Sequence, residues 1–229
     1  SQDSLCLSVY GIYEPGTTKI IKEKIKKGDF VVDIGAHIGY YTILFAKIVG
    51  KEGKVFAFEP EPNNFSFLEK NVKFNNFANV ILFQKAVLDK RGRAKLFLNP
   101  VNSGGHSIFI SQSNSGRFII VETVQLDEVL KDVKKINLIK IDTEGSEHKV
   151  IQGSLDILKK HSPKIILEFN PTLPVRISDL VLSLELLLGL GYRIFEISEK
   201  KKKIFPITVR ELILKSQKMK EYVNLLCEK

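Results

Sequence analysis

The strongest signal of the fold is the segment Phe30-Val31-Val32-Asp33-Ile34-Gly35-Ala36-His37-Ile38-Gly39-Tyr40-Tyr41-Thr42. It reads as an apolar strand ending in Asp33, a turn with two glycines in the spacing Gly-x-x-x-Gly, and an apolar helix starting at Tyr40. Glycine at both turn positions lets the backbone approach a ligand with no Cβ in the way. The helix that follows offers free N–H groups and a positive dipole end. The stretch therefore predicts a loop for a nucleotide-type or adenosyl-type cofactor.

A second signal follows in the next strand. The glycine spacing is not the Gly-x-Gly-x-x-Gly of a dinucleotide site, and no Lys-Ser/Thr follows as in a P-loop. The strand Lys54–Phe58 leads directly into Glu59, which lies 20 residues after Gly39. An acid about 20 residues past a glycine-rich loop is suited to a ribose diol, because one carboxylate can accept two neighbouring hydroxyl groups. We therefore expect Glu59 to bind a ribose.

Size and composition indicate an ordinary folded domain. The chain has 229 residues, of which 44% are hydrophobic and 27% charged, enough for a full core. We expect one domain over residues 1–229, with residues 1–28 as an N-terminal helical lead-in. Lysine and arginine exceed aspartate and glutamate by 35 to 26, but the lysines are scattered except for Lys200–Lys203. A solvated surface explains that distribution better than a nucleic-acid interface.

Cysteine usage and hydropathy predict the cellular setting. The two cysteines, Cys6 and Cys227, lie near opposite ends of the chain, and no Cys-x-x-Cys motif is present. This argues against a zinc site or a redox motif. A thiol-poor chain without a signal peptide fits a reducing compartment, and we expect a cytoplasmic location. No apolar run is long enough to span a membrane.

Apolar strands alternate with helices along the whole chain, which predicts a mostly parallel sheet covered by helices on both faces. The expected strands are Phe30–Ile34, Lys54–Phe58, Val80–Lys85, Lys95–Leu98, Phe118–Gln125, Asn137–Ile141, Lys164–Phe169, Tyr192–Ile197 and Tyr222–Leu226, with Ile204–Ile207 pairing back after the lysine turn. The expected helices are Thr17–Lys27, Tyr40–Val49, Glu61–Phe74, Glu147–Leu158, Val175–Leu188 and Thr208–Lys220. Ligands of such sheets bind at the carboxyl ends of the strands. The residues placed there are Asp33, Glu59, Ala86, Asp142 and Glu168.

Four segments together resemble the FkbM-like methyltransferases, which use S-adenosylmethionine: Val31–Thr42, Val55–Pro60, Lys140–Glu147 and Ile166–Phe169. Many methyltransferases share the first two, whereas Ile-Asp-Thr-Glu-Gly-Ser-Glu in the third is specific to this family. The resemblance covers about residues 10–227. It implies an α/β class I methyltransferase fold with a Rossmann-like, seven-stranded, mostly parallel sheet. It also implies S-adenosylmethionine as cofactor and O-methylation of a hydroxyl on a sugar or other small metabolite.

Carried over by position, the resemblance assigns a role to each part of the cofactor site. The first glycine loop would surround the methionine part, and the start of the next helix would hold the methionine carboxylate. Glu59 would take the ribose hydroxyls, Pro60 would shape the adenine wall, and Gln84, where many relatives have an acid, would face the adenine. His37 stands where asparagine is common and counts as a loop residue, and Glu14 could close over the cofactor. The predicted cofactor residues are Glu14, Asp33, Gly35, Ala36, His37, Gly39, Tyr41, Thr42, Glu59, Pro60, Gln84, Ala86 and Asp142.

A hydroxyl acceptor must also lose its proton to a nearby Asp, Glu or His. The predicted catalytic residues are Asp142, Glu144 and His106. Asp142 ends a buried strand, where a carboxylate is costly unless something binds it. His106 lies in the loop 99–116, which is rich in Gly, Ser and Asn, and loops often carry function. Glu14 and His148 are weaker candidates, and Glu147 fits a structural role at a helix start.

Several alternatives remain open from the sequence. Asp142, Glu168 and Asn170 could offer oxygen ligands to Mg²⁺. We favour the interpretation that Glu168 and Asn170 line the acceptor pocket, and the need for a metal stays open. The charge of +9 suggests an RNA or other nucleic-acid methyltransferase, but Asp142-Thr143-Glu144-Gly145 replaces the Asn/Asp-Pro-Pro-aromatic pattern of many such enzymes. A non-catalytic cofactor-binding scaffold is a third hypothesis. We expect a small-molecule or glycan acceptor, no nucleic acid, and homo-oligomers as an open option.

Overall fold

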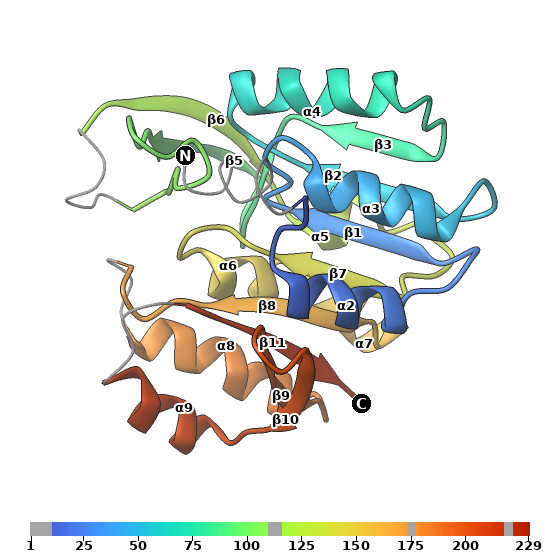
Figure 1. Cartoon of the computed structure of the whole chain (residues 1–229). Coiled ribbons are helices and arrows are strands. Elements are labelled where there is room, and N and C mark those ends of the chain that lie inside the picture. Colours follow the sequence, from blue (N-terminus) through green and yellow to red (C-terminus); the bar gives the residue numbers. More distant parts are fainter. Residues whose placement is uncertain (1–10, 110–115, 174–176, 218–221) are drawn as a thin grey trace.

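The computed structural model describes residues 11–109, 116–173, 177–217 and 222–229 (Figure 1). In this part of the chain the central sheet has eight strands in the order β10–β9–β11–β8–β7–β1–β2–β3. The strands are β1 Phe30–Ile34, β2 Lys54–Phe58, β3 Val80–Phe83, β7 Leu138–Ile141, β8 Lys164–Phe169, β9 Arg193–Ser198, β10 Lys203–Pro206 and β11 Val223–Glu228. Strands β3, β2, β1, β7 and β8 pair in parallel. The pairings of β8 with β11, β11 with β9, and β9 with β10 are antiparallel. The expected mostly parallel sheet is confirmed.

The sheet has one strand more than the seven that the family resemblance implies. Seven strands run from β3 to β9, and β10 extends them as a hairpin partner of β9. The turn between β9 and β10 contains the lysine cluster, as expected from the sequence. β10 therefore corresponds to the segment expected to pair back on its neighbour.

Helices cover both faces of the sheet. The helices are α2 Pro15–Lys24, α3 Tyr40–Val49, α4 Pro62–Phe74, α5 Leu126–Val129, α6 Glu147–Gln152, α7 Leu155–His161, α8 Ile177–Gly189 and α9 Val209–Ser216. Alternate residues of a strand point to opposite faces. Val31 of β1 packs in the cluster with α2 and α3, whereas Val32 packs in the larger cluster with α5 to α9. This alternation explains why the strands are apolar throughout.

A second, smaller sheet stands beside the central one (Figure 1). It consists of β4 Ala86–Val87, β5 Gly92–Phe97 and β6 Phe118–Val124, in the order β4–β6–β5. The sequence predicted β5 and β6 approximately, but neither the two-residue strand β4 nor the separate sheet. The small sheet carries the loop that begins at residue 98, whose residues 98–109 are described. We call these residues the β5–β6 loop.

Two helices differ from expectation because tertiary contacts set their ends. The helix expected at Thr17–Lys27 begins at Pro15, and the Glu199 carboxylate accepts hydrogen bonds from the Gly16 and Thr17 N–H groups at 2.6 and 2.9 Å. The helix expected at Glu147–Leu158 is divided into α6 and α7. A Cβ at Gly153, between these helices, would lie 2.1 Å from the Leu88 carbonyl oxygen, so the chain passes too close for a side chain.

Some expectations lie partly outside the described residues. These are the N-terminal part of the lead-in with Cys6, the start of the helix expected from residue 175, and the end of the helix expected to reach residue 220. Cys227 is buried in β11 as a free thiol. The assignment of residues 1–229 to one domain stays a prediction.

None of the described helices is long and apolar enough to cross a membrane.

Candidate active site

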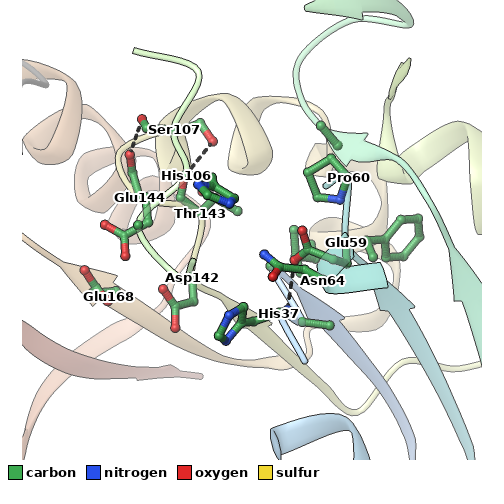
Figure 2. A pocket seen from close by; sticks show the side chains of 18 of the residues that line it. His37, Glu59, Pro60, Asn64, His106, Ser107, Asp142, Thr143, Glu144 and Glu168 are labelled. Atoms are coloured by element: carbon green, nitrogen blue, oxygen red, sulfur yellow. Dashed lines mark hydrogen bonds between the residues drawn. The ribbon is translucent and has the colours of Figure 1, made fainter. Parts of the chain in front are cut away.

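A cavity of about 410 Å³ lies at the carboxyl ends of the parallel strands (Figure 2). Its walls come from the loop after β1, the ends of β2, β7 and β8, and the β5–β6 loop. The predicted site residues that line it are Asp33, Gly35, Ala36, His37, Tyr41, Glu59, Pro60, Ala86, His106, Asp142 and Glu144. The structure thus gathers in one cavity most of the residues that the sequence singled out. Glu14, Gly39, Thr42 and Gln84 are not part of its wall.

The two glycines of the loop after β1 have positive φ angles of 80° and 98°. A Cβ at Gly35 would lie 1.7 Å from the Asp142 carbonyl oxygen, and one at Gly39 would lie 2.6 Å from the Leu68 side chain. Both positions therefore need glycine for packing within the protein, in addition to any approach of a ligand. Gly35 in particular lets the loop after β1 touch the end of β7.

Glu59 follows β2, and its carboxylate is held by backbone donors. The N–H of His37 donates to Oε2 at 2.8 Å, and the N–H of Glu61 donates to Oε1 at 2.9 Å. Burial raises the pKa of Glu59 to about 7, and these two hydrogen bonds limit the rise. The Asn64 side chain also interacts with this carboxylate and lowers its pKa. Glu59 lines the cavity, and a carboxylate oxygen can accept more than one hydrogen bond. The geometry fits two neighbouring hydroxyl groups of a ribose.

Asp33 carries an acceptor without a donor. Its Oδ2 accepts a hydrogen bond from the Thr42 hydroxyl at 2.6 Å, so Thr42 acts on Asp33 and not on the cavity. Within the described residues, buried Oδ1 of Asp33 has no hydrogen-bond partner. A buried polar atom without a partner is uncommon in folded proteins and marks a place where a ligand donor would be stabilised. Burial raises the pKa of Asp33, although nearby Lys140 and Thr42 lower it.

Lys140 is a buried cation in the wall of the cavity. Its Nζ lies 2.7 Å from Asp142 Oδ2 and 4.6 Å from the centroid of the Tyr41 ring. Burial lowers the pKa of Lys140, but the carboxylates of Asp142, Asp33 and Glu14 outweigh this effect and raise it. The ammonium group therefore stays charged. Lys140 and Asp33 are paired in register across β7 and β1, which places both on the face covered by α2 and α3.

Glu14 is one of the acidic residues whose charge acts on Lys140. It precedes α2 and is buried, and its carboxylate accepts hydrogen bonds from the Tyr41 hydroxyl at 2.5 Å and from the Asn224 amide at 2.9 Å. Burial raises its pKa, while Lys140 lowers it. A direct contact between Glu14 and a cofactor stays a prediction, and in this structure Glu14 orients Tyr41.

The β5–β6 loop is fastened to three other elements. The Ser103 hydroxyl lies 2.9 Å from His37 Nε2, and the Asn64 amide donates to the Ser103 carbonyl at 2.9 Å. The Ser107 hydroxyl donates to the Glu144 carbonyl at 2.6 Å (Figure 2). These contacts connect the loop to the turn after β1, to α4 and to the turn after β7.

His106 points into the cavity with a defined tautomer. Its Nδ1 accepts a hydrogen bond from the Asn99 N–H at 3.0 Å, so the ring proton of the neutral form lies on Nε2. Burial lowers the pKa of His106, which also favours the neutral form. The ring is thereby prepared as a hydrogen-bond donor through Nε2. Its catalytic role stays a prediction.

The remaining wall carries acidic, amide and aromatic groups. Glu168 at the end of β8 is buried, and its Oε1 accepts a hydrogen bond from the Asn170 amide at 3.0 Å. Tyr13, Leu173 and Tyr222 complete this wall. Glu147 does not line the cavity, and its Oε1 accepts hydrogen bonds from the Thr143 N–H and hydroxyl and from the Gly145 N–H. These contacts agree with a structural role, which stays a prediction. His148 also lies outside the wall.

The described part of the chain contains no group of three or more His, Cys, Asp or Glu side chains placed to hold a metal ion.

Sequence reasoning missed several residues of the wall. These residues are Asn64 in α4, Ser103 in the β5–β6 loop and Tyr222 before β11. No local sequence motif marks them. Only Ser103 had a general signal, because its loop is rich in Gly, Ser and Asn.

The order of the seven strands from β3 to β9, with the cavity at their carboxyl edge, defines the class I methyltransferase fold. The family model described as "Methyltransferase FkbM domain" matches residues 33–194. The chain therefore belongs to the FkbM methyltransferase family, as the sequence motifs predicted.

Relatives and solved structures agree with this family. The chain is 27% identical over 149 residues to the hexuronic acid methyltransferase AglP of Haloferax volcanii, covering 64% of this chain and 58% of that protein. It is 29% identical over 163 residues to the 31-O-demethyl-FK506 methyltransferase FkbM of Streptomyces tacrolimicus, covering 58% of this chain and 62% of that protein. The chain thus spans less than two thirds of the length of these relatives. The crystal structure of a methyltransferase FkbM from Methylobacillus flagellatus superposes with a TM-score of 0.57 at 17% identity, over 87% of this chain and 43% of that one.

Proposed function

We propose that this protein is an S-adenosylmethionine-dependent O-methyltransferase that acts on a hydroxyl group of a sugar or another small metabolite. The observation that carries the proposal is the cavity itself. It joins a carboxylate held for a ribose, at Glu59, to an acidic wall suited to hydroxyl groups, at Asp142 and Glu168. When bound, S-adenosylmethionine would supply an electrophilic methyl group on a positively charged sulfur.

The residues of the cofactor half fit this molecule. Glu59 would accept both ribose hydroxyls while its backbone donors keep the carboxylate in place. The unpartnered Oδ1 of Asp33 would accept from the ammonium group of the methionine part. His106 Nε2–H offers a donor from the β5–β6 loop. A ligand that donates a hydrogen bond to a buried acceptor without a partner relieves its desolvation cost, which supports binding at Asp33.

The acceptor half would orient a hydroxyl group toward the methyl donor. Methyl transfer depends mainly on alignment, and a rigid wall supplies alignment at little cost at the moment of reaction. Glu168 and Asn170 are fixed by their mutual hydrogen bond and offer groups that bind hydroxyls. Tyr13 and Tyr222 add aromatic surface that suits the apolar face of a sugar ring.

The named relatives support an acceptor of this kind. One is named for a hexuronic acid, which is a sugar acid, and the other for an O-demethylated FK506, so one name indicates a sugar-type acceptor and the other indicates transfer to an oxygen atom. A glycan acceptor, a cytoplasmic location and assembly into homo-oligomers stay predictions for this chain.

The test begins with calorimetric titration of S-adenosylmethionine and S-adenosylhomocysteine into the purified protein. We expect micromolar binding of both, and weaker binding in the Glu59→Ala variant. Transfer of a radioactive methyl group to a panel of sugars, polyols and RNA then identifies the acceptor class. A folded protein that binds neither cofactor would contradict the proposal, and methylation of RNA alone would favour the nucleic-acid alternative.

A further inference from the structure

The ends of β7 and β8 bring two carboxyl groups together. Ile141 of β7 is paired with Leu167 of β8 in parallel register, so Asp142 and Glu168 follow as the next pair and share one face of the sheet. Both side chains line the cavity (Figure 2). Strands in a sheet lie about 4.8 Å apart, which leaves room for a direct hydrogen bond between the two carboxyl groups. Such a bond requires that one of them carries a proton.

The hydrogen bonds around the pair indicate which oxygen carries this proton. The Asn170 amide oxygen accepts from the Thr172 N–H and hydroxyl at 3.2 and 2.6 Å, so the amide nitrogen faces Glu168 and donates to Oε1. Oε2 of Glu168 is therefore the oxygen that remains for a proton. Asp142 Oδ2 accepts from the Lys140 ammonium at 2.7 Å, which favours an ionised Asp142.

The surroundings of Glu168 oppose a negative charge. The groups that face it are Asp142 directly after β7, Glu144 in the next turn, Glu147 on α6, Asn224 in register on β11, Tyr222 before β11, and its own neighbour Asn170. Burial and the charges of Asp142, Glu144 and Glu147 raise the pKa of Glu168 well above its usual value. Lys140 and the hydrogen bond from Glu168 outweigh burial and lower the pKa of Asp142. Two carboxyl groups in one site commonly separate in this way.

We propose that Asp142 and Glu168 act as one carboxyl–carboxylate pair, which holds a single proton in the free protein and accepts the proton of the acceptor hydroxyl during methyl transfer. This inference rests on the proposed function and adds Glu168 to the catalytic residues. The acceptor oxygen forms its bond to the methyl carbon while the carbon–sulfur bond breaks and leaves its electron pair on sulfur. The hydroxyl proton passes to the ionised carboxylate of the pair, and the pair later returns a proton to water.

The pair also predicts a difference between cofactor and product. The sulfur of S-adenosylmethionine is positively charged, whereas that of S-adenosylhomocysteine is neutral. A cation next to a protonated carboxyl group favours its ionisation. Binding of S-adenosylmethionine should therefore release more protons than binding of S-adenosylhomocysteine. Both molecules carry the same ribose, so any proton released by Glu59 cancels in this difference.

Calorimetric titrations in buffers with different ionisation enthalpies measure the number of protons released. We expect the difference between the two ligands in the unchanged protein and in the surface control Glu23→Gln, and its loss in Glu168→Gln. Turnover of Glu168→Gln should fall by about 100-fold or more. Should this variant not fold, infrared difference spectra of the unchanged protein provide the same test. The carbonyl band of a protonated carboxyl group should then decrease on binding S-adenosylmethionine but not S-adenosylhomocysteine.

Three outcomes would overturn the inference. Equal proton release with both ligands would mean that the pair does not hold a proton near the sulfur. A difference that persists in Glu168→Gln would assign the proton to another group. A difference that disappears with a chelator and returns with Mg²⁺ would make the two carboxylates metal ligands instead. Failure of both ligands to bind is a separate result, because it contradicts the proposed function itself.

Discussion

The two ends of the cavity place their carboxylates in opposite surroundings. Glu59, at the β2 end, is held by two backbone N–H groups. Asp142, at the β7 end, forms an ion pair with Lys140 and faces a second carboxyl group on Glu168. Burial raises the pKa of Glu59 to about 7, whereas the charge of Lys140 holds the pKa of Asp142 low. Partners, more than burial alone, therefore set the pKa of a carboxyl group in this cavity.

The largest effect is expected from removing the ion pair between Lys140 and Asp142. In Lys140→Met, Asp142 and Asp33 lose their buried cation, and removal of one partner from a buried ion pair typically costs about 3–5 kcal/mol. Urea denaturation should show this loss in the free energy of unfolding. Lys203→Met, at an exposed lysine of β10, is the control and should change stability little. A Lys140→Met protein as stable as the parent would mean that the carboxylates are protonated without the cation.

The next effect tests the backbone-held end. Glu59→Ala removes two charged hydrogen bonds to the ribose, and we expect a loss of about 1–3 kcal/mol in S-adenosylmethionine binding. Calorimetric titration measures this change in affinity. Glu52→Ala, in an exposed ion pair with Lys27, provides a matched control that should bind normally. Unchanged affinity in Glu59→Ala would exclude the ribose assignment.

A pH titration tests whether the ionisation of Glu59 controls the affinity for the cofactor product. Because the pKa of Glu59 is raised to about 7 in the free protein, the carboxylate is mostly ionised at pH 8 and mostly protonated at pH 6. The ionised form is the better acceptor of two hydroxyls, so affinity should fall as the pH drops through 7. We expect about tenfold weaker binding of S-adenosylhomocysteine at pH 6 than at pH 8. Glu59→Gln should bind more weakly and lose this pH dependence, and a dependence of the same size in that variant would assign it elsewhere.

The smallest effect concerns the β5–β6 loop, which bridges the two ends. Ser103→Ala removes the contact with His37 Nε2. We expect the attached conformation of the loop to lose about 0.5–1.5 kcal/mol of stability relative to its open conformation. Hydrogen exchange of the backbone N–H groups at residues 99–107 should become several-fold faster. Ser198→Ala, at the end of β9, should leave that exchange unchanged. Equal protection in both variants would mean that Asn64 and Ser107 hold the loop by themselves.

Local sequence predicted some elements to the residue. β1, α3, β2 and β8 have the expected bounds, because each is an apolar segment bordered by glycine, proline or a polar turn. The start of α2 and the break between α6 and α7 could not be predicted in this way. They depend on Glu199 and on the Leu88 carbonyl, which come from distant parts of the chain.

The candidate site likewise has features that local sequence predicts and features that depend on tertiary contacts. Local sequence is enough to predict which acids stand at strand ends, because turn glycines and apolar runs are local signals, and it placed Asp33, Glu59 and Asp142 at one edge. The groups that surround these acids depend on tertiary contacts. The register of β7 against β8 brings Glu168 beside Asp142, and the packing of α2 and α3 buries Lys140 with them. The protonation of a carboxyl group depends on burial and on charges a few ångströms away, and both arise only when distant segments meet.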